Sequence, residues 1–190
     1  MRTIRLSACM LAAVFLTNVT HAQTMAKEKT VMVGGAPMYP SKNIIENAVN
    51  SKDHTTLVAA VKAAGLVETL QSAGPFTVFA PTNKAFEKLP KGTVDMLLLP
   101  ENKAMLASVL TYHVVQGRIN AEDLLKMIKE GNGTATLSTV NGGTLTAMVK
   151  GNKVMLKDGM GGISTVSIAD VNQSNGVIHV IDAVALPKGK

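Results

Sequence analysis

Residues 74–86 read GPFTVFAPTNKAF and contain three of the four phenylalanines in the chain. Apolar side chains dominate residues 76–80, a run short enough for a strand that is buried on both faces. Pro81 has no N–H to donate to a sheet ladder, so the strand is expected to end there. Thr82 can then cap a helix that begins at Asn83. The stretch therefore predicts a buried strand followed at once by a short helix.

The segments on both sides of this stretch show the spacing of amphipathic helices. Apolar residues recur every three or four positions, and Gly65 and Gly131 stand where helices are expected to end. Met105 is among the residues expected to face inward. The predicted helical segments are residues 43–49, 53–65, 66–70, 83–89, 93–98, 101–110 and 120–131.

The last third of the chain is different, because its residues alternate and are divided by turns. Residues 141–143 (NGG) and 151–152 (GN) are hairpin signals, since glycine and asparagine tolerate positive φ. Strands are expected at residues 111–115, 134–140, 145–150, 153–156, 163–168 and 177–185. Helices crowd the first two thirds and strands the remainder, which favours an α+β fold over alternating α/β.

The N-terminus has the pattern of a secretory signal. Arg2 and Arg5 precede a mostly apolar run over residues 11–19, which is too short to span a membrane. No later segment is long enough either, so the mature chain is expected to be exported, to the periplasm or beyond. Cys9 is the only cysteine and would be removed with residues 1–22, so no disulfide is expected.

The charge balance of the chain excludes one class of partner. The sequence carries 19 basic and 13 acidic residues, and removing Arg2 and Arg5 lowers the excess from +6 to +4. The remaining lysines are scattered, without basic runs or interleaved aromatic residues. Nucleic acid is therefore not an expected partner. A mild attraction to acidic polysaccharide or to anionic lipid surfaces is compatible with this charge, but a solvated surface of positive bias is the simpler explanation.

The residues that could carry catalysis or hold a metal do not form a recognisable constellation. His54, His113 and His179 have no metal-ligand spacing, and no Gly-x-Ser-x-Gly elbow occurs. Asp182 follows His179 by three positions, which in a strand places the two side chains on opposite faces. Residues 159–162 (GMGG) lack the strand, helix and lysine of a phosphate loop. We expect no catalytic residue, metal or cofactor, and interpret His179 as a core histidine.

Three motifs in this order resemble the fasciclin-type domain, specifically a single-domain secreted bacterial member. Residues 74–86 are similar to its first signature, Tyr112-His113 to its tyrosine-histidine motif, and residues 175–182 (NGVIHVID) to its second signature. The resemblance covers residues 41–187. It implies a wedge of two small β-sheets with several helices packed against them, in which the two signatures are adjacent central strands.

The resemblance also implies adhesion to a cell-surface or matrix protein or polysaccharide, without enzymatic activity. The expected contact residues are Tyr112 and His113, together with Asn83 and Lys84 on the exposed part of the helix after Pro81. As strand residues, Tyr112 and His113 would point to opposite faces, so a buried structural tie is the alternative role for this pair.

A second functional reading is a carrier or sensor of a small apolar ligand held between sheet and helices. Adaptable methionines could line such a pocket, among them Met96, Met105, Met127, Met148 and Met155. The domain organisation predicted from the whole sequence is a signal peptide at 1–22, an N-terminal linker at 23–40, the fasciclin-like domain at 41–187 and a tail at 188–190. A monomer is expected.

Overall fold

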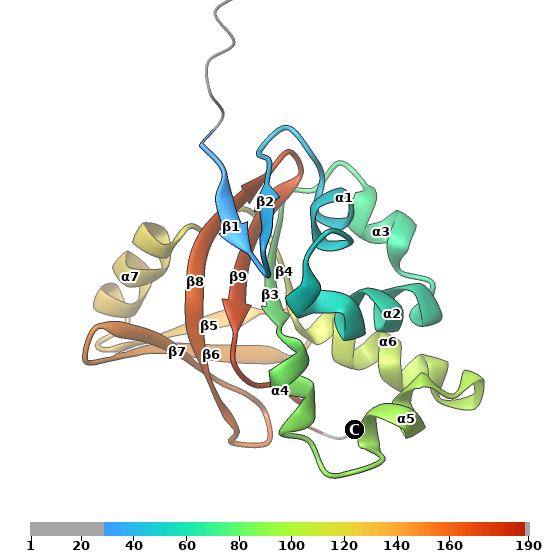
Figure 1. Cartoon of the computed structure of the whole chain (residues 1–190). Helices are drawn as coiled ribbons and strands as arrows, with labels where there is room; N and C mark the ends of the chain where they lie inside the picture. Colours follow the sequence, from blue (N-terminus) through green and yellow to red (C-terminus); the bar gives the residue numbers. More distant parts are fainter. Residues whose placement is uncertain (1–28, 189–190) are drawn as a thin grey trace, which may run out of the picture.

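The computed structural model describes residues 29–188 and has the α+β class predicted from the sequence (Figure 1). In these residues one two-stranded hairpin accompanies a seven-stranded sheet of order β4-β3-β9-β8-β7-β6-β5. The hairpin is β1 (Val31–Val33) and β2 (Ala36–Met38). The seven strands are β3 (Phe76–Pro81), β4 (Val114–Gln116), β5 (Thr134–Ser138), β6 (Thr144–Lys150), β7 (Lys153–Lys157), β8 (Ile163–Gln173) and β9 (Gly176–Ile181).

Most of the helices gather on one side of the main sheet, whereas α7 lies apart beside β5 and β6 (Figure 1). Two helix boundaries lie at the residues predicted from the sequence. Gly65, with φ 74°, follows the end of α2, and Asn120 precedes the start of α7. The helices are α1 (Ile44–Ala48), η1 (Lys52–His54), α2 (Thr55–Ala64), α3 (Val67–Gln71), α4 (Asn83–Glu87), α5 (Thr93–Leu98), η2 (Pro100–Asn102), α6 (Lys103–Tyr112) and α7 (Ala121–Glu130).

The two signature strands are neighbours in the sheet, as the resemblance implied. β3 and β9 pair in parallel from Phe76↔Gly176 to Pro81↔Ile181. A Cβ added at Gly176 would lie 2.2 Å from the carbonyl oxygen of Phe76, so this close approach requires glycine. Thr82 caps α4 as predicted, because its side-chain oxygen accepts a hydrogen bond from the N–H of Ala85.

The central strand β3 is buried on both faces because it separates two hydrophobic clusters. Val78 and Ala80 pack into the first cluster, under helices α1 to α6. Phe79 points the other way, into a second cluster built with β4 to β7 and α7. Register shifts along β8 interrupt its pairing with β9, and bulges of this kind bend a sheet. The curvature brings β5 back towards β4, so the far strands cover the face that the helices leave open.

Residues 31–38 differ from the sequence prediction, which placed them in an N-terminal linker. They form the β1–β2 hairpin, and Val33 and Met38 are buried in the first cluster. Gly34 and Gly35 make the turn with φ 57° and 77°, values that only glycine adopts freely. Strands of three residues are too short for a periodic pattern, although Gly34-Gly35 is a turn signal that could have indicated the hairpin.

The strand predicted for residues 111–115 is also wrong in its first half. The helix α6 continues through Tyr112, and only Val114–Gln116 form β4. The hydroxyl of Thr111 donates to the carbonyl oxygen of Ala107 at 2.7 Å, which accommodates a β-branched residue inside a helix. The helix also turns differently from the prediction, since Met105 is exposed rather than inward.

Some predictions concern residues outside the described range. The signal at residues 1–22, the first part of the expected linker and the end of the C-terminal tail belong to this group. Within residues 29–188, every helix is too short or too polar to cross a membrane.

Candidate functional site

Tyr112 ends α6 with its side chain in the second cluster, where it is 1% exposed. Its hydroxyl donates to the carbonyl oxygen of Thr144 at 2.5 Å and accepts from the N–H of Gly159 at 2.8 Å. Burial raises the pKa of the Tyr112 hydroxyl, which favours the protonated donor. A Cβ on Gly143 would lie 2.8 Å from the ring, so the tyrosine packs directly on that glycine. Tyr112 thus ties α6 to β6 and to the β7–β8 loop.

His113 is equally buried, at 2% exposure, and both ring nitrogens are satisfied. Nδ1 lies 2.8 Å from the carbonyl oxygen of Val109, which can only accept, so we assign the proton to Nδ1. Nε2 accepts from the N–H of Ala185 at 3.0 Å. This pattern needs a neutral ring. Burial lowers the pKa of His113 to about 4, although the Val109 carbonyl and Asp158 act in the opposite direction.

The prediction that Tyr112 and His113 are strand residues is wrong, although their side chains do point to different sides, Tyr112 into the second cluster and His113 towards the cavity beside the first. The pair lies instead at the end of a helix, with both side chains in the protein interior. Their observed contacts are those of a structural tie between α6, the main sheet and the segment after β9. A partner-contact role for the two residues remains a prediction that these contacts do not test.

The other two predicted contact residues begin α4 and have different surroundings. Asn83 is half-buried and makes three hydrogen bonds: it donates to the Lys52 carbonyl and the Thr55 hydroxyl at 2.9 Å each, and accepts from the N–H of Thr56 at 3.0 Å. These bonds fix α4 against the start of α2. Lys84 is exposed. Of the four predicted residues, Lys84 is therefore the one whose side chain lies at the surface.

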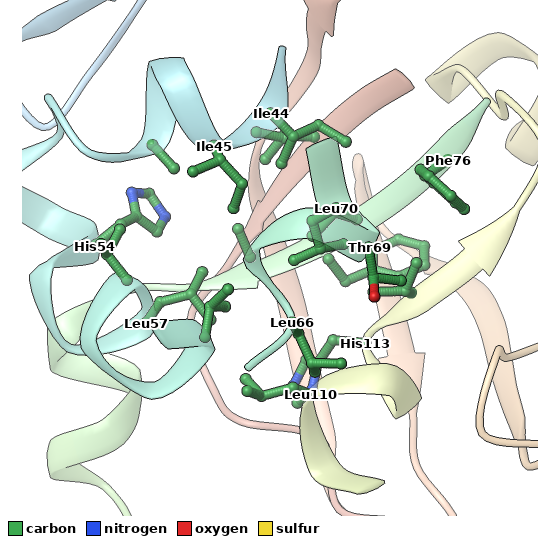
Figure 2. Close-up of a pocket in the computed structure, with 18 of the residues that line it drawn as sticks. Ile44, Ile45, His54, Leu57, Leu66, Thr69, Leu70, Phe76, Leu110 and His113 are labelled. Atoms are coloured by element: carbon green, nitrogen blue, oxygen red, sulfur yellow. The ribbon is translucent and has the colours of Figure 1, made fainter. Parts of the chain in front are cut away.

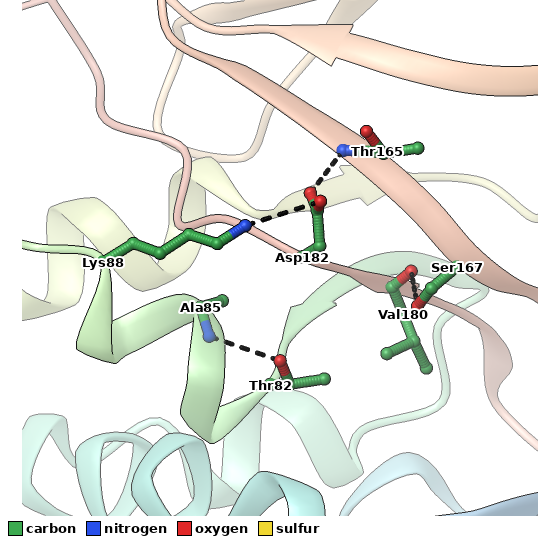
Figure 3. A network of polar contacts seen from close by, with 7 residues as sticks. All are labelled: Thr82, Ala85, Lys88, Thr165, Ser167, Val180 and Asp182. Carbon is green, nitrogen blue, oxygen red and sulfur yellow. Dashed lines mark hydrogen bonds and ion pairs between the residues drawn. The ribbon is translucent and has the colours of Figure 1, made fainter.

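A second set of polar contacts fixes the other end of α4, as Figure 3 shows. Lys88 lies 3.5 Å from a carboxylate oxygen of Asp182, just after β9. The other carboxylate oxygen accepts a hydrogen bond from the N–H of Thr165 in β8 at 2.7 Å. Both partners of the ion pair are about half exposed, so its contribution to stability is small. Its effect is to orient α4 on the sheet.

A small cavity of about 60 Å³ lies between the helices and β3 (Figure 2). Its walls are almost entirely apolar, and Leu57, Leu66, Leu70 and Leu110 are among the residues around it. Met38 is the methionine in this lining, and none of the five methionines predicted for an apolar pocket contributes. A void of this kind stays dry because water would find too few polar partners.

His54 is one of four polar residues in this cavity wall, together with Thr69, Thr111 and His113. Its Nδ1 lies 2.9 Å from the buried hydroxyl of Ser51, while Nε2 has no hydrogen-bond partner in the described part of the chain. Burial lowers the pKa of His54, and the nearby Ala80 carbonyl opposes this without reaching hydrogen-bond geometry. The ring is therefore a neutral histidine at one side of an apolar space.

His179 is a satisfied core histidine, as interpreted from the sequence. It is 1% exposed, stacks on Phe79 with ring centroids 5.6 Å apart, and its Nε2 lies 2.8 Å from the Ile119 carbonyl. Burial lowers the pKa of His179 as well. Within residues 29–188, no three His, Cys, Asp or Glu side chains are placed to hold a metal ion together.

Large apolar side chains reach solvent along α5, η2 and the start of α6. Met96 and Met105 are each 59% exposed, and Leu99 between them is 42% exposed. Exposed Lys84 and Lys91 precede them in the chain, on α4 and in the loop before α5. We call these five residues the α4–α6 surface. The sequence pattern predicted Met105 in the core, because helical periodicity shows which residues share a face but not how far along the helix that face is covered.

Comparisons with known proteins agree with the motifs and the fold. The profile of the Fasciclin domain family matches residues 52–187. Protein sll1483 of Synechocystis is 47% identical over 92% of this chain and 90% of its own length. Immunogenic protein MPB70 of Mycobacterium bovis is 37% identical over 74% of this chain and 66% of its own. Human periostin is 28% identical over 89% of this chain, which is 19% of periostin.

The fold itself matches a solved structure. A FAS1 domain pair from the insect cell adhesion molecule Fasciclin I aligns with a TM-score of 0.69, over 77% of this chain and 51% of that one. The sequence identity of 21% limits this likeness to the fold. With three motifs in order, the paired signature strands and a family match over most of the described residues, the chain belongs to the fasciclin domain family.

Proposed function

We propose that this protein is an exported, non-enzymatic interaction module that adheres to a cell surface, a matrix polymer or a partner protein. The family is known from adhesion-type and extracellular proteins, which supports the class of function. The observation that carries the proposal is the exposure of three large apolar side chains of the α4–α6 surface, Met96, Leu99 and Met105, along the consecutive segments α5, η2 and α6, which contact one another. Exposed apolar patches rimmed by polar residues are typical of binding sites.

The predicted contact residues take different roles in this proposal. Lys84 contacts the partner directly and favours acidic groups such as those of a polysaccharide. Asn83 positions Lys84, since its hydrogen bonds hold α4 against α2. Tyr112 and His113 act from the interior by holding α6, whose first turn carries Met105. Substituting either buried residue would then weaken adhesion only through the position or stability of α6.

We expect the double substitution Met96→Ser and Met105→Ser to weaken adhesion by about tenfold or more. Burying a methionine side chain contributes about 1.5–3 kcal/mol, and about 1.4 kcal/mol is a factor of ten. The measurement is retention of protein-coated beads on immobilised alginate and on whole bacterial cells. Lys84→Glu is expected to reduce retention on alginate more than on cells, because alginate carries dense negative charge.

The matched control is Met160→Ser, because Met160 is 65% exposed but lies in the β7–β8 loop, outside the α4–α6 surface. Adhesion that falls equally in the control and the double variant would show a non-specific loss of apolar surface. Failure of the native protein to adhere to either substrate would contradict the proposed function.

Carriage of a small apolar ligand is the second candidate, and the apolar cavity between sheet and helices favours it. The cavity volume of about 60 Å³ is small for a ligand site, however, which makes carriage the weaker candidate. Ligand sites usually measure about 300–1,000 Å³, so a ligand would have to move the helices that cover the sheet.

Native mass spectrometry of freshly purified protein separates the two functions, and we expect the mass of the bare chain. Under the carrier hypothesis a co-purifying apolar molecule is seen instead. That extra mass would be lost in Val61→Leu, which fills the cavity, and kept in Val149→Leu, which alters an exposed strand residue.

A further inference from the structure

The main sheet almost closes into a barrel and leaves a gap between its two end strands. β4 and β5 are the ends of the strand order, and they meet at the antiparallel bridge Val115↔Thr139. Beside it, the N–H of Val140 donates to the carbonyl oxygen of Val114 at 2.8 Å. Beyond the bridge β4 turns away at Gly117, where φ is 93°. The outer edge of β5 therefore continues without a neighbouring strand.

The hydrogen bonds between β5 and β6 show which backbone N–H groups of β5 point towards its open edge. The N–H of Thr139 donates to the Gly143 carbonyl at 2.9 Å, towards β6, whereas that of Val140 points to β4. Backbone groups of successive strand residues point to opposite neighbours, and the β5–β6 register is unbroken. Two and four residues before Val140, the N–H groups of Ser138 and Thr136 therefore point outward, away from β6, and no strand of residues 29–188 pairs with β5 on this side at their positions.

A groove runs along this open edge. Two adjoining hollows of about 380 and 420 Å³ share Met127 and Thr136 in their walls. The first is also lined by the apolar side chains Val115, Ile119 and Leu137. The second extends to Glu130 at the end of α7, the only charged residue that lines either hollow. The groove thus offers a strand edge, an apolar centre and one negative end.

We propose that an extended peptide segment of a partner protein binds here as an additional strand, antiparallel to β5. An unpaired edge provides backbone hydrogen bonds to such a peptide, and the pockets beside it select alternate side chains. Residues opposite Leu137 and Ala135 face inward and should be apolar. The C-terminal end of the peptide lies nearest Glu130 and should be basic. This inference rests on the proposed function as an interaction module and assigns it a partner class.

Charge favours such a peptide over a second copy of this chain. β5 reads Thr-Ala-Thr-Leu-Ser, so pairing two β5 edges would bring no basic side chain from either strand to Glu130. A peptide with a basic end supplies that charge. Pairing of two copies is therefore an outcome of the test rather than part of the proposal.

The test measures fluorescence polarisation of labelled acetyl-TVTVTK-amide, with TVTVTE and KTVTVT as charge and direction controls. We expect TVTVTK to bind most tightly and Thr136→Pro to weaken it by about tenfold, because one strand hydrogen bond is lost. Proline is tolerated on an edge strand where the N–H faces outward, so the variant should fold. Thr136→Val keeps the N–H and should bind within about twofold of the native protein.

Charge reversal supplies the second arm. Glu130→Lys is expected to abolish the preference for TVTVTK over TVTVTE, whereas Glu122→Lys, an exposed residue at the other end of α7, should leave it unchanged. Absence of binding by all three peptides, or equal binding by Thr136→Pro, overturns the proposal. A dimer that Thr136→Pro dissolves overturns it in favour of a second copy. If bead adhesion persists while the peptides fail, the proposed function stands and this site does not.

Discussion

Tyr112→Ala is expected to lower the free energy of unfolding by about 3–5 kcal/mol, the usual cost of removing a buried aromatic ring. The substitution empties the space over Gly143 and leaves the Thr144 carbonyl and the Gly159 N–H without their partner. One substitution causes all of these losses, because the ring packing and both hydrogen bonds come from the same side chain. Chemical denaturation followed by circular dichroism measures the change.

Tyr112→Phe separates the hydroxyl from the ring in this experiment. It keeps the packing on Gly143 and removes only the two hydrogen bonds, so the expected loss is about 1–3 kcal/mol. A Tyr112→Ala protein that stays within about 1 kcal/mol of the native stability would contradict the assignment of Tyr112 as a structural tie. The Phe variant also tests adhesion in a stable protein, because a direct partner contact through the hydroxyl would fail without unfolding.

Acidification from pH 6.5 to pH 4 is expected to cost the protein about 3 kcal/mol of stability through His113 alone. Burial lowers the pKa of His113 from 6.5 to about 4 in the folded state. Each pKa unit corresponds to about 1.4 kcal/mol. The unfolded chain therefore binds a proton at a pH where the folded protein does not, so stability falls as the pH drops through this window and is fully present above it.

The burial of His54 and His179 lowers their pKa values too, so both contribute to the same acid sensitivity. Replacing His113 by Gln, which has no titrating group, should reduce the slope of stability against pH between 6.5 and 4 without abolishing it. Urea unfolding at half-unit steps of pH gives this slope. An unchanged slope in His113→Gln would show that the acid sensitivity has another source.

The candidate site was only partly predictable, because sequence patterns report on a residue and its near neighbours. The motif Tyr112-His113 could be located in the sequence, yet its apolar and β-branched neighbours fit a strand as well as a helix end. The residues that form hydrogen bonds with the side chains of Tyr112 and His113 are distant in the chain, namely Thr144, Gly159 and Ala185. Exposure was equally unpredictable, since Met105 has the helical spacing of the buried residues Val109 and Tyr112, yet its own side chain in the first turn of α6 is 59% exposed.

The amino-acid sequence alone predicted those features that depend on a few consecutive residues. It predicted the buried strand and threonine-capped helix of residues 74–86, the stop at Gly65, the start at Asn120 and the α+β class. Through the resemblance it also identified the family and the pairing of the signature strands. Most of these features follow from hydrogen bonds, φ angles and side-chain volumes that act locally. The pairing of the signature strands follows instead from the family resemblance, which links the two motifs.

Long-range packing fixed which side chains the surface presents. It buried Tyr112 and His113, left Lys84 at the surface, and exposed the methionines of α5 and α6. It also turned β4 away from β5 and so opened the groove beside Thr136. The physical reason is that burial and unpaired strand edges depend on contacts between segments far apart in the chain, which no local period encodes.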